Sequence, residues 1–476
     1  MGKWTRWGRA ALLAVLCWSG GAAHADESVE TWPDGTPRVR TWLDPEGRKN
    51  GRHVEYFADG KVALETTYAR DVLEGAYTTY HPNGRPALKA TYRGGKLVGR
   101  HETFDADGAP RRVATYADGR LNGRVEHLRG RRPIATQTWK DGEIVSLDGV
   151  PLAPRPREEL DRLLAQIAAG TEPATKPDPR KPRRDAKPGP RPPAKADPAP
   201  PPAPPDLEAD RLAALRRLRQ YRCLCGVPWD DVALDDEANR YAQAAAEICA
   251  ALGEITHEPT NPGWEPGRFT FAAKGAASCN LHQSVVAAPS VDGYMDDSDP
   301  SNIGRVGHRR WCLNVPMTKT GFGVARSSAG KAFTAMWAMD RGRAQRPELD
   351  AVAYPTRGWQ PVTMFGPAYA WCVAPSERRF PHVVPEAVRV RVRKLDEEFV
   401  PSGEPLALEA FSVQTDSVGL SPCVIFRPKG VEVADGAAYW VEVTGLSDPD
   451  KAKKGAPPDL AYAVRFYGVP PADDGR

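Results

Sequence analysis

The segment Asn302–Gly323, NIGRVGHRRWCLNVPMTKTGFG, brings several charged and reactive side chains together in one short stretch. It contains a histidine, three arginines, a tryptophan, a cysteine and a Gly-Phe-Gly turn. Residues 311–313 are apolar, Pro316 ends the run, and Gly321 and Gly323 allow a second backbone to approach closely. This pattern predicts a buried strand that enters or leaves a site.

Charged residues in and near this segment could bind a ligand, and each group has a simpler alternative. Arg309 and Arg310 could hold an anion, but arginines beside a buried tryptophan often pair with carboxylates instead. Asp296, Asp297 and Asp299 could be taken for a calcium loop, but the Gly and the terminal Glu of an EF-hand are missing. We therefore expect the aspartates to form a solvated helix end.

Two amphipathic helices precede this segment and must position it. Leucines at helical spacing predict a first helix over 207–225, which Gly226 and Pro228 end. Asp235 is expected to cap a second helix that ends at Gly253. Its apolar residues recur at i, i+3 and i+4, the spacing of one buried face: Ala238, Tyr241, Ala242, Ala245, Ile248, Cys249 and Leu252.

Three motifs in this region, in the expected order, resemble the CAP superfamily of cysteine-rich secretory proteins, antigen 5 and plant pathogenesis-related proteins. The motifs are LRRLRQYRCLCGVP, then VALDDEANRYAQAAAEICAALGEITHEP, then HRRWCLN followed by Gly321 in TGFG. The resemblance covers the chain from residue 207 to roughly 340. It implies an α-β-α sandwich, which we assign to residues 207–345.

The resemblance also implies a ligand cleft with two histidines. These correspond to His257 in ITHEP and His308 in GHRRW, and one family glutamate matches Asp297 at best. The glutamate of the family's G-E-N-L motif has no equivalent, because AASCNL stands at that place. The implied cleft residues are His257, Asp297, His308, Asn280 and Arg309.

Two interpretations of this cleft stay open. Two imidazoles and one carboxylate, from His257, His308 and Asp297, could hold Zn²⁺ or another divalent metal with an open position. Alternatively, the two histidines hydrogen-bond each other or the backbone across a polar cleft. Glu258 and His282 are neighbours that could replace the missing ligand.

A nucleophilic mechanism has weaker support. Ser278 and Cys279 would lie near His308 if the alignment with the family holds, but no nucleophile elbow accompanies them. The missing glutamate favours binding over catalysis, since general acid-base work needs a positioned titratable group. We therefore name no catalytic residue and expect that the protein is not an enzyme.

The cysteines are expected to form disulfides if the chain is exported. The candidates lie within or just after the CAP-like region and are Cys223, Cys225, Cys249, Cys279, Cys312 and Cys372. Cys423 lies alone in the last module, so at least one thiol is free or intermolecular. The sequence does not determine the connectivity.

Residues 1–25 have the composition of a Sec-type signal peptide. Three basic residues precede the short apolar stretch 10–18, and Ala-His-Ala at 23–25 fits the cleavage pattern. Cleavage before Asp26 would leave a mature chain with no stretch of about 18 apolar residues, the length of a membrane-spanning helix. We therefore expect a periplasmic, cell-surface or secreted protein without a transmembrane segment.

Residues 26–147 contain an internal repeat. Glycines recur at a step of 24, as Gly51, Gly75, Gly99 and Gly123, and again as Gly60, Gly84 and Gly108. Short alternating runs joined by Asp-Gly or Asn-Gly predict β-hairpins that stack into one sheet. The pattern resembles the bacterial variant of the MORN repeat, in about five copies. We expect the aromatics that share this step to be core residues rather than a binding stripe.

The remaining segments are expected to join or follow these modules. Residues 148–170 hold a short helix over Arg157–Ala169, and the Pro-, Ala- and Lys-rich residues 171–206 form a disordered linker. Residues 346–380 are expected to be a connector. Alternating valines and regular turns over residues 381–476 predict a small β-sandwich.

The fold class expected is therefore a multidomain chain, and three functions are compatible with it. The first is an exported, non-catalytic binding protein whose cleft takes a small ligand, a lipid or a metal. The second is a metal-dependent hydrolase or peptidase that uses His257, Asp297 and His308. The third is a scaffold that binds a protein partner through its repeats. The net charge of +4 argues against a nucleic-acid partner.

Overall fold

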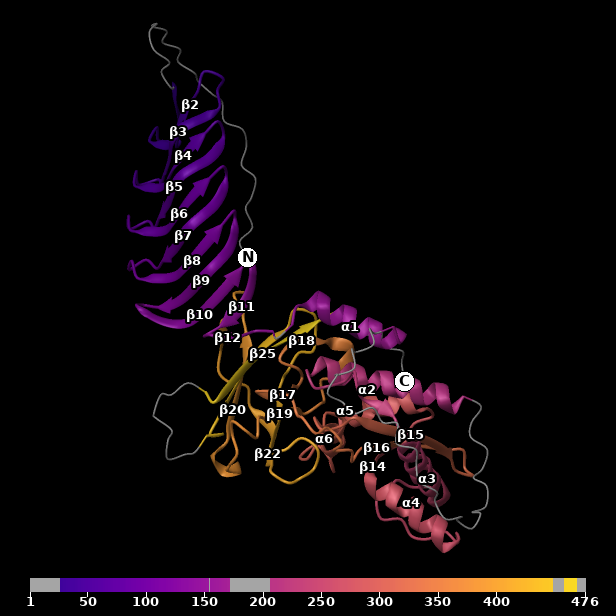
Figure 1. Cartoon of the computed structure of the whole chain (residues 1–476). Coiled ribbons are helices and arrows are strands. Elements are labelled where there is room, and N and C mark those ends of the chain that lie inside the picture. Colours follow the sequence, from indigo (N-terminus) through magenta and orange to yellow (C-terminus); the bar gives the residue numbers. More distant parts are fainter. Residues whose placement is uncertain (1–25, 154, 172–205, 448–457, 469–476) are drawn as a thin grey trace. The chain divides into compact units, whose positions relative to one another are not determined.

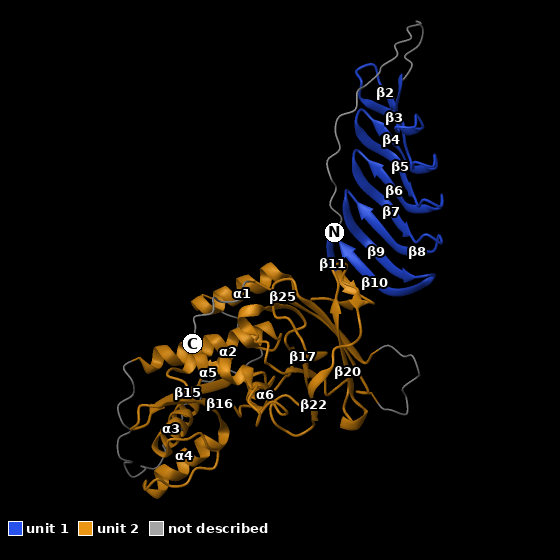
Figure 2. Cartoon of the chain, turned by 180° about the vertical axis from the view of Figure 1, so that it is seen from behind, with its two compact units in different colours: residues 1–144 blue, residues 145–476 orange. Residues whose placement is uncertain are grey.

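The computed structural model describes residues 26–153, 155–171, 206–447 and 458–468 of the 476-residue chain (Figure 1). These residues form two compact units, 1–144 and 145–476 (Figure 2). The expected signal peptide and nearly all of the expected linker lie outside the described residues. No helix in the described part is long and apolar enough to cross a membrane.

The N-terminal part of the chain is a long antiparallel sheet of 12 strands, whose order in the sheet is their order in the sequence. The strands are β1 Asp26–Thr31, β2 Pro37–Leu43, β3 Lys49–Tyr56, β4 Val62–Ala69, β5 Val72–Tyr80, β6 Pro86–Arg93, β7 Lys96–Phe104, β8 Pro110–Ala117, β9 Arg120–Arg129, β10 Arg132–Lys140, β11 Glu143–Leu147 and β12 Val150–Pro151. Gly60, Gly84 and Gly108 have positive φ in the turns between strands. The Asp-Gly and Asn-Gly turns therefore lie where the hairpins require them.

Aromatic rings repeat along this sheet at the 24-residue step. The pairs His53–Tyr68, Tyr77–Tyr92 and His101–Tyr116 each have ring centroids 5.5 Å apart. His53 is buried and the other five rings are half-buried. The covered positions include small residues such as Ala90 and Ala114. These rings thus form a partly covered row along the sheet.

The next part of the chain places helices on both faces of a four-stranded sheet, β13-β15-β16-β14. Its strands are β13 Ala233–Leu234, β14 Cys279–His282, β15 Lys319–Arg326 and β16 Ala332–Trp337. Its helices are α2 Leu207–Leu224, α3 Asp236–Leu252, α4 Pro266–Ser278, α5 Ala287–Asp296 and α6 Gly307–Cys312. Phe322 and Met336 pack with residues of α2 and α5, whereas Phe333 and Ala335 pack with residues of α3 and α4. Alternate side chains of the sheet therefore serve two separate cores.

The expected helix boundaries in this region are confirmed. Helix α2 ends at Leu224, and α1, Arg157–Ala169, has the expected bounds. The Asp235 carboxylate accepts the backbone N–H of Ala238 at 3.0 Å and caps α3, and Gly253 ends α3 in a left-handed conformation.

The expectation of a buried strand across residues 311–313 is wrong. Residues 307–312 form the short helix α6, in which Arg310 N–H donates to the Val306 carbonyl at 3.0 Å and Leu313 N–H to that of Arg309 at 3.0 Å. A run of three apolar residues does not distinguish a strand from a helix. The strand β15 begins later, at Lys319.

The C-terminal part contains two further sheets. One has the order β17-β19-β23-β22 and the other β18-β25-β24-β20-β21. Their strands are β17 Ala351–Tyr354, β18 Gly358–Pro361, β19 Trp371–Pro375, β20 Arg389–Leu395, β21 Pro401–Ser402, β22 Leu408–Gln414, β23 Cys423–Pro428, β24 Ala438–Thr444 and β25 Leu460–Tyr467. The ring of Trp371 in β19 lies 5.7 Å from Tyr439 in β24 and 6.3 Å from Phe466 in β25, so the sheets face each other.

The segment 346–380, expected to be a connector, supplies three strands to these sheets. β17 pairs with β19, and β18 pairs in parallel with the last strand, β25. The sequence suggested a segment that only joins two modules. However, β19 pairs with β23, and β18 pairs with β25, which lies about a hundred residues further along the chain. The region after α6 is therefore built into the C-terminal sheets and does not merely lead to them.

Helix α3 lies unusually close to strand β15, because two glycines face it. A Cβ atom at Gly321 would lie 2.2 Å from the backbone nitrogen of Asn239, and one at Gly323 would lie 2.3 Å from that of Gln243. The side chains of Asn239 and Gln243 also accept the N–H groups of Phe322 and Val324. The strand can therefore contact the helix backbone without an intervening side chain.

We predict that Gly321→Ala lowers the free energy of unfolding by about 1–3 kcal/mol, the usual cost of overpacking a close contact. Gly304→Ala is the matched control, because a Cβ there meets no atom within 4 Å. Urea unfolding of both variants measures the difference. Equal stability of the two variants would contradict the proposed contact.

Candidate functional site

The residues implied by the family resemblance come together around the short helix α6. His308 belongs to α6, Asp297 follows the end of α5, Asn280 lies in β14 and His257 lies in the turn after α3. The centroids of the His257 and His308 rings are 6.5 Å apart. His257 is exposed and His308 is half-buried, so the pair forms an accessible site.

The buried Asp297 carboxylate orients His308. Its Oδ1 lies 2.8 Å from His308 Nδ1, and its Oδ2 accepts the backbone N–H of Arg309 at 3.2 Å. Asp297 adopts a left-handed conformation with φ 52°, which aspartate tolerates better than most residues. Both oxygens of Asp297 thus contact the His308–Arg309 segment, and Asp297 positions His308.

His257 is held by the backbone. Its Nδ1 lies 2.8 Å from the carbonyl oxygen of Ala276, which can only accept, so Nδ1 carries a proton. The Nδ1 of His308 contacts the Asp297 carboxylate in the same way. Among the described residues, neither Nε2 atom has a hydrogen-bond partner. The two histidines therefore do not bond each other, and the Nε2 atom of each is unengaged.

Arg309 does not line the cleft as an anion-binding residue. Its side chain is fully buried, and its guanidinium donates to the carbonyls of Met295 at 2.7 Å, Asp296 and Ala370. Each of its three nitrogens therefore donates to a carbonyl oxygen in the interior.

Asn280 is a positioning residue. Its side-chain amide donates to the His308 carbonyl at 3.0 Å and to Cys312 Sγ at 3.6 Å, and the residue is buried. Asn280 therefore fixes α6 against β14 from behind the site.

Tyr294 was not identified from the sequence. Its ring lies 5.6 Å from that of His308 and 5.9 Å from that of His282, and its hydroxyl donates to the Asn280 carbonyl at 3.1 Å. Burial raises the pKa of Tyr294. Its position three residues before Asp297 could have indicated it, because residues at this spacing lie on the same face of a helix.

Glu258 and His282, the two residues that could replace the missing ligand, have other surroundings than the His257–His308 pair. Glu258 is exposed, and the ring of His282 packs so closely on Gly293 that a Cβ there would lie 2.3 Å from Nε2. Burial lowers the pKa of His282, and the neighbouring His308 adds to this effect. Across the described ranges, no three His, Cys, Asp or Glu side chains converge to hold a metal ion.

The described cysteines are all free and buried, contrary to the disulfides that we expected. They are Cys223, Cys225, Cys249, Cys279, Cys312, Cys372 and Cys423. Cys423, which is alone in the last module of the sequence, lies beside Cys372 of β19. The contact between the two thiols lowers the pKa of Cys372 and raises that of Cys423. The pairing of β19 with β23 brings these two strands together.

Comparison with known proteins identifies part of the second unit. Residues 215–338 match the model of the cysteine-rich secretory protein family, CAP. These residues form a CAP domain. The match contains α3, β15 and the His308–Asp297 pair, and it ends where the C-terminal sheets begin.

Comparisons beyond the family add little. No curated protein matches the chain. Among solved structures, a crystal structure of a mutant of S. aureus TarM in complex with fondaparinux, α-GlcNAc-glycerol and UDP is similar at 9% identity and a TM-score of 0.15. The likeness covers 20% of this chain and 19% of that one, and a similarity this low supports no argument about fold or function.

We predict that Asp297→Ala destabilises the CAP domain by about 1–3 kcal/mol, because His308 and the Arg309 N–H lose their buried acceptor. Asp297→Asn keeps an acceptor oxygen and tolerates the left-handed backbone, so its effect should be smaller. Glu258→Ala, at an exposed position, is the control. Thermal unfolding ranks the three variants, and an Asp297→Ala protein as stable as the control would refute the role given to Asp297.

We also predict that the CAP domain loses stability as the pH falls below the ordinary histidine pKa of 6.5, partly because of His282. The pKa of His282 is lower in the folded state than in the unfolded state, so the unfolded chain takes up the proton first and gains stability from it. Replacement His282→Gln should reduce this pH dependence. Urea unfolding at pH 7.5 and at pH 5.5 tests it, and an unchanged dependence in the variant would exclude His282 as a source.

Proposed function

We propose that this protein is an exported, non-catalytic binding protein whose CAP domain takes a small ligand between His257 and His308. The observation that supports this most is the pair of anchored imidazoles, each held at Nδ1 and each with an unengaged Nε2. Such a pair can accept hydrogen bonds from a ligand at fixed positions. Because His257 is exposed, a ligand can reach the site without a large change in structure.

Binding accounts for the surroundings of the site better than catalysis does. The thiols of Cys279 and Cys312 belong to the elements around the site, and burial raises the pKa of both. A thiol held in its neutral form is a poor nucleophile. The Asp297 carboxylate accepts two hydrogen bonds, so it orients His308 rather than taking a proton from water.

The alternative of a metal-dependent hydrolase at His257, Asp297 and His308 is less well supported. A catalytic zinc needs three protein ligands and an open position. The two Nε2 atoms provide two donors, and Asp297 is engaged as an outer partner of His308. The donor set therefore does not fit a resident zinc centre, although the two imidazoles could still contact a metal carried by a ligand.

The other modules extend this proposal. The 24-residue step of the hairpins supports a MORN-like array, and the two facing C-terminal sheets support a β-sandwich. The half-covered aromatic row favours a second role, in which the repeats contact a protein partner as a scaffold. The composition of residues 1–25 supports export to the periplasm, the cell surface or the medium.

We predict that native mass spectrometry of the full chain, purified without added metal, detects a bound small organic molecule. The double variant His257→Ala/His308→Ala should lose this adduct, while the exposed control Glu258→Ala should keep it. An adduct retained by the double variant, or none in the parent protein, would contradict the proposal. A stoichiometric zinc adduct that disappears in the double variant would instead favour the metal site and justify a hydrolase screen.

A further inference from the structure

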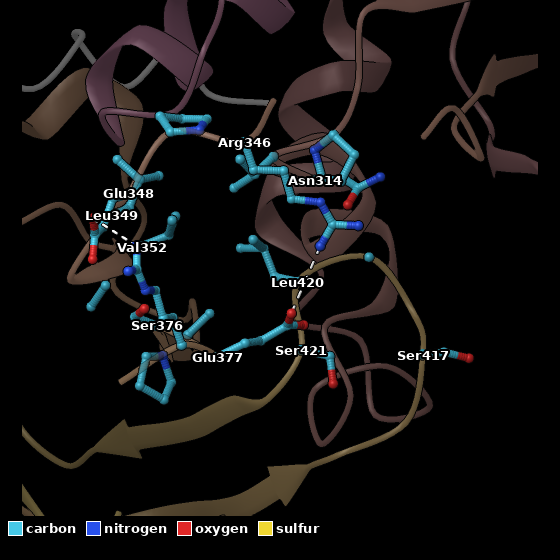
Figure 3. Close-up of a pocket in the computed structure, with 18 of the residues that line it drawn as sticks. Asn314, Arg346, Glu348, Leu349, Val352, Ser376, Glu377, Ser417, Leu420 and Ser421 are labelled. Atoms are coloured by element: carbon cyan, nitrogen blue, oxygen red, sulfur yellow. Dashed lines mark hydrogen bonds and ion pairs between the residues drawn. The ribbon is translucent and has the colours of Figure 1, made fainter. Parts of the chain in front are cut away.

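A second cavity, of about 490 Å³, lies away from the two histidines (Figure 3). Its walls come from the residues after α6, the segment 341–352 that leads into β17, the end of β19, and the loop between β22 and β23. Neither His257, Asp297 nor His308 lines it. The cavity is thus formed where the CAP domain adjoins the C-terminal sheets, and the CAP domain alone does not contain it.

Four apolar side chains line this cavity. They are Val315, Leu349, Val352 and Leu420, of which Val352 and Leu420 are themselves buried in the core, and in Figure 3 Leu420 lies across the cavity from Leu349 and Val352. Its volume lies in the range of about 300–1,000 Å³ that is typical of small-molecule sites. An apolar group of a ligand would therefore be shielded from water here.

Two ion pairs connect facing segments at the edge of the cavity. Arg346 lies 3.7 Å from Glu377, and Arg378 lies 3.1 Å from Glu348, so each segment contributes one arginine and one glutamate. In Figure 3, Glu377 extends across the cavity from the side of Ser376. All four side chains are more than half exposed, and such pairs contribute little stability. An incoming anion can therefore replace Glu377 at Arg346 at little cost.

One of the three arginines that line the cavity has no carboxylate partner in the described part of the chain. Asp416 in the wall pairs with Arg310, whose fully buried guanidinium also donates to the Leu420 carbonyl at 2.7 Å. Among the described residues, Arg310 Nη1 has no hydrogen-bond partner. Arg341 donates to the Ser417 carbonyl at 2.6 Å and faces the Trp311 ring, and no carboxylate in the described part pairs with it.

The cavity lining contains three arginines, Arg341, Arg346 and Arg378, and three carboxylates, Glu348, Glu377 and Asp416. The two glutamates pair with Arg346 and Arg378, and Asp416 pairs with Arg310, which does not itself line the cavity. Among the described residues Arg341 is thus left without a carboxylate partner, and hydroxyl groups from Ser376, Ser417 and Ser421 also line the cavity. We propose that this cavity binds a small organic monoanion, with its apolar body against Leu349 and Leu420 and its anionic group toward Arg341 and Arg346.

The site can be tested in the full chain with anilinonaphthalene sulfonate, an apolar monoanion that fluoresces when shielded from water. Phenylnaphthylamine, which has the same ring system without the charge, is the matched neutral probe. We expect the anion to bind more tightly than the neutral probe. Arg341→Gln should weaken the anion about fivefold, as loss of one partly exposed charge contact does, and should leave the neutral probe unaffected.

Two further variants separate the cavity from non-specific binding. Ser417→Trp, in an exposed loop of the wall, should block both probes without touching the core. Arg326→Gln, at the exposed end of β15, should change neither affinity. Equal binding of the two probes would overturn the assignment to an anion. Binding that is unchanged by both Arg341→Gln and Ser417→Trp would overturn the assignment to this cavity. Displacement of the anionic probe by inorganic phosphate alone would overturn the assignment to an apolar ligand.

Discussion

Fully buried arginine side chains hold the short helix α6 in place, and both sites of the second unit depend on that placement. Arg309 donates to carbonyls at the end of α5 and near β19, and Arg310 donates to the loop between β22 and β23. From the other side, Arg222 of α2 donates to the carbonyls of Cys312 and Asn314 at 2.7 and 3.0 Å. A buried charge is very costly unless its donors are satisfied, so these contacts restrict where α6 can lie.

This restriction links the two sides of the helix. His308 faces the cleft and depends on Asp297, which itself follows the end of α5. Two residues later, Arg310 reaches the wall of the second cavity through Asp416 and Leu420. A helix of six residues thus positions groups for two different sites. Because so short a helix has few internal hydrogen bonds, its position depends on the contacts of its side chains.

The sequence predicts those features that are determined locally. The cap at Asp235, the end of α3 at Gly253 and the Asp-Gly hairpin turns depend on a few neighbouring residues, and each is found where it was expected. The histidine pair was located because the family motifs surround it. The helix α6 was not predicted, because its apolar run is short and its conformation depends on Asp297 and on distant carbonyl groups.

The features of the cysteines and of the segment 346–380 that were not predicted share one cause, which is contact between residues far apart in the sequence. Cys372 and Cys423 meet because β19 pairs with β23, and no spacing pattern indicates this. The segment 346–380 contains strands whose partners come later in the chain. Its side chains also line the second cavity, and no motif or spacing in the sequence predicts that cavity.

Arg309 shows most clearly why residue type alone misleads. An arginine beside a histidine in a cleft suggests an anion site, since its fork suits carboxylates and phosphates. Here the acceptors are the carbonyls of Met295 and Asp296, which end α5 without partners within the helix. A cation at a helix C-terminus also interacts favourably with the helix dipole. The same chemistry that would bind a ligand therefore completes a helix, and Arg309 is buried in the interior while its neighbour His308 stays partly exposed.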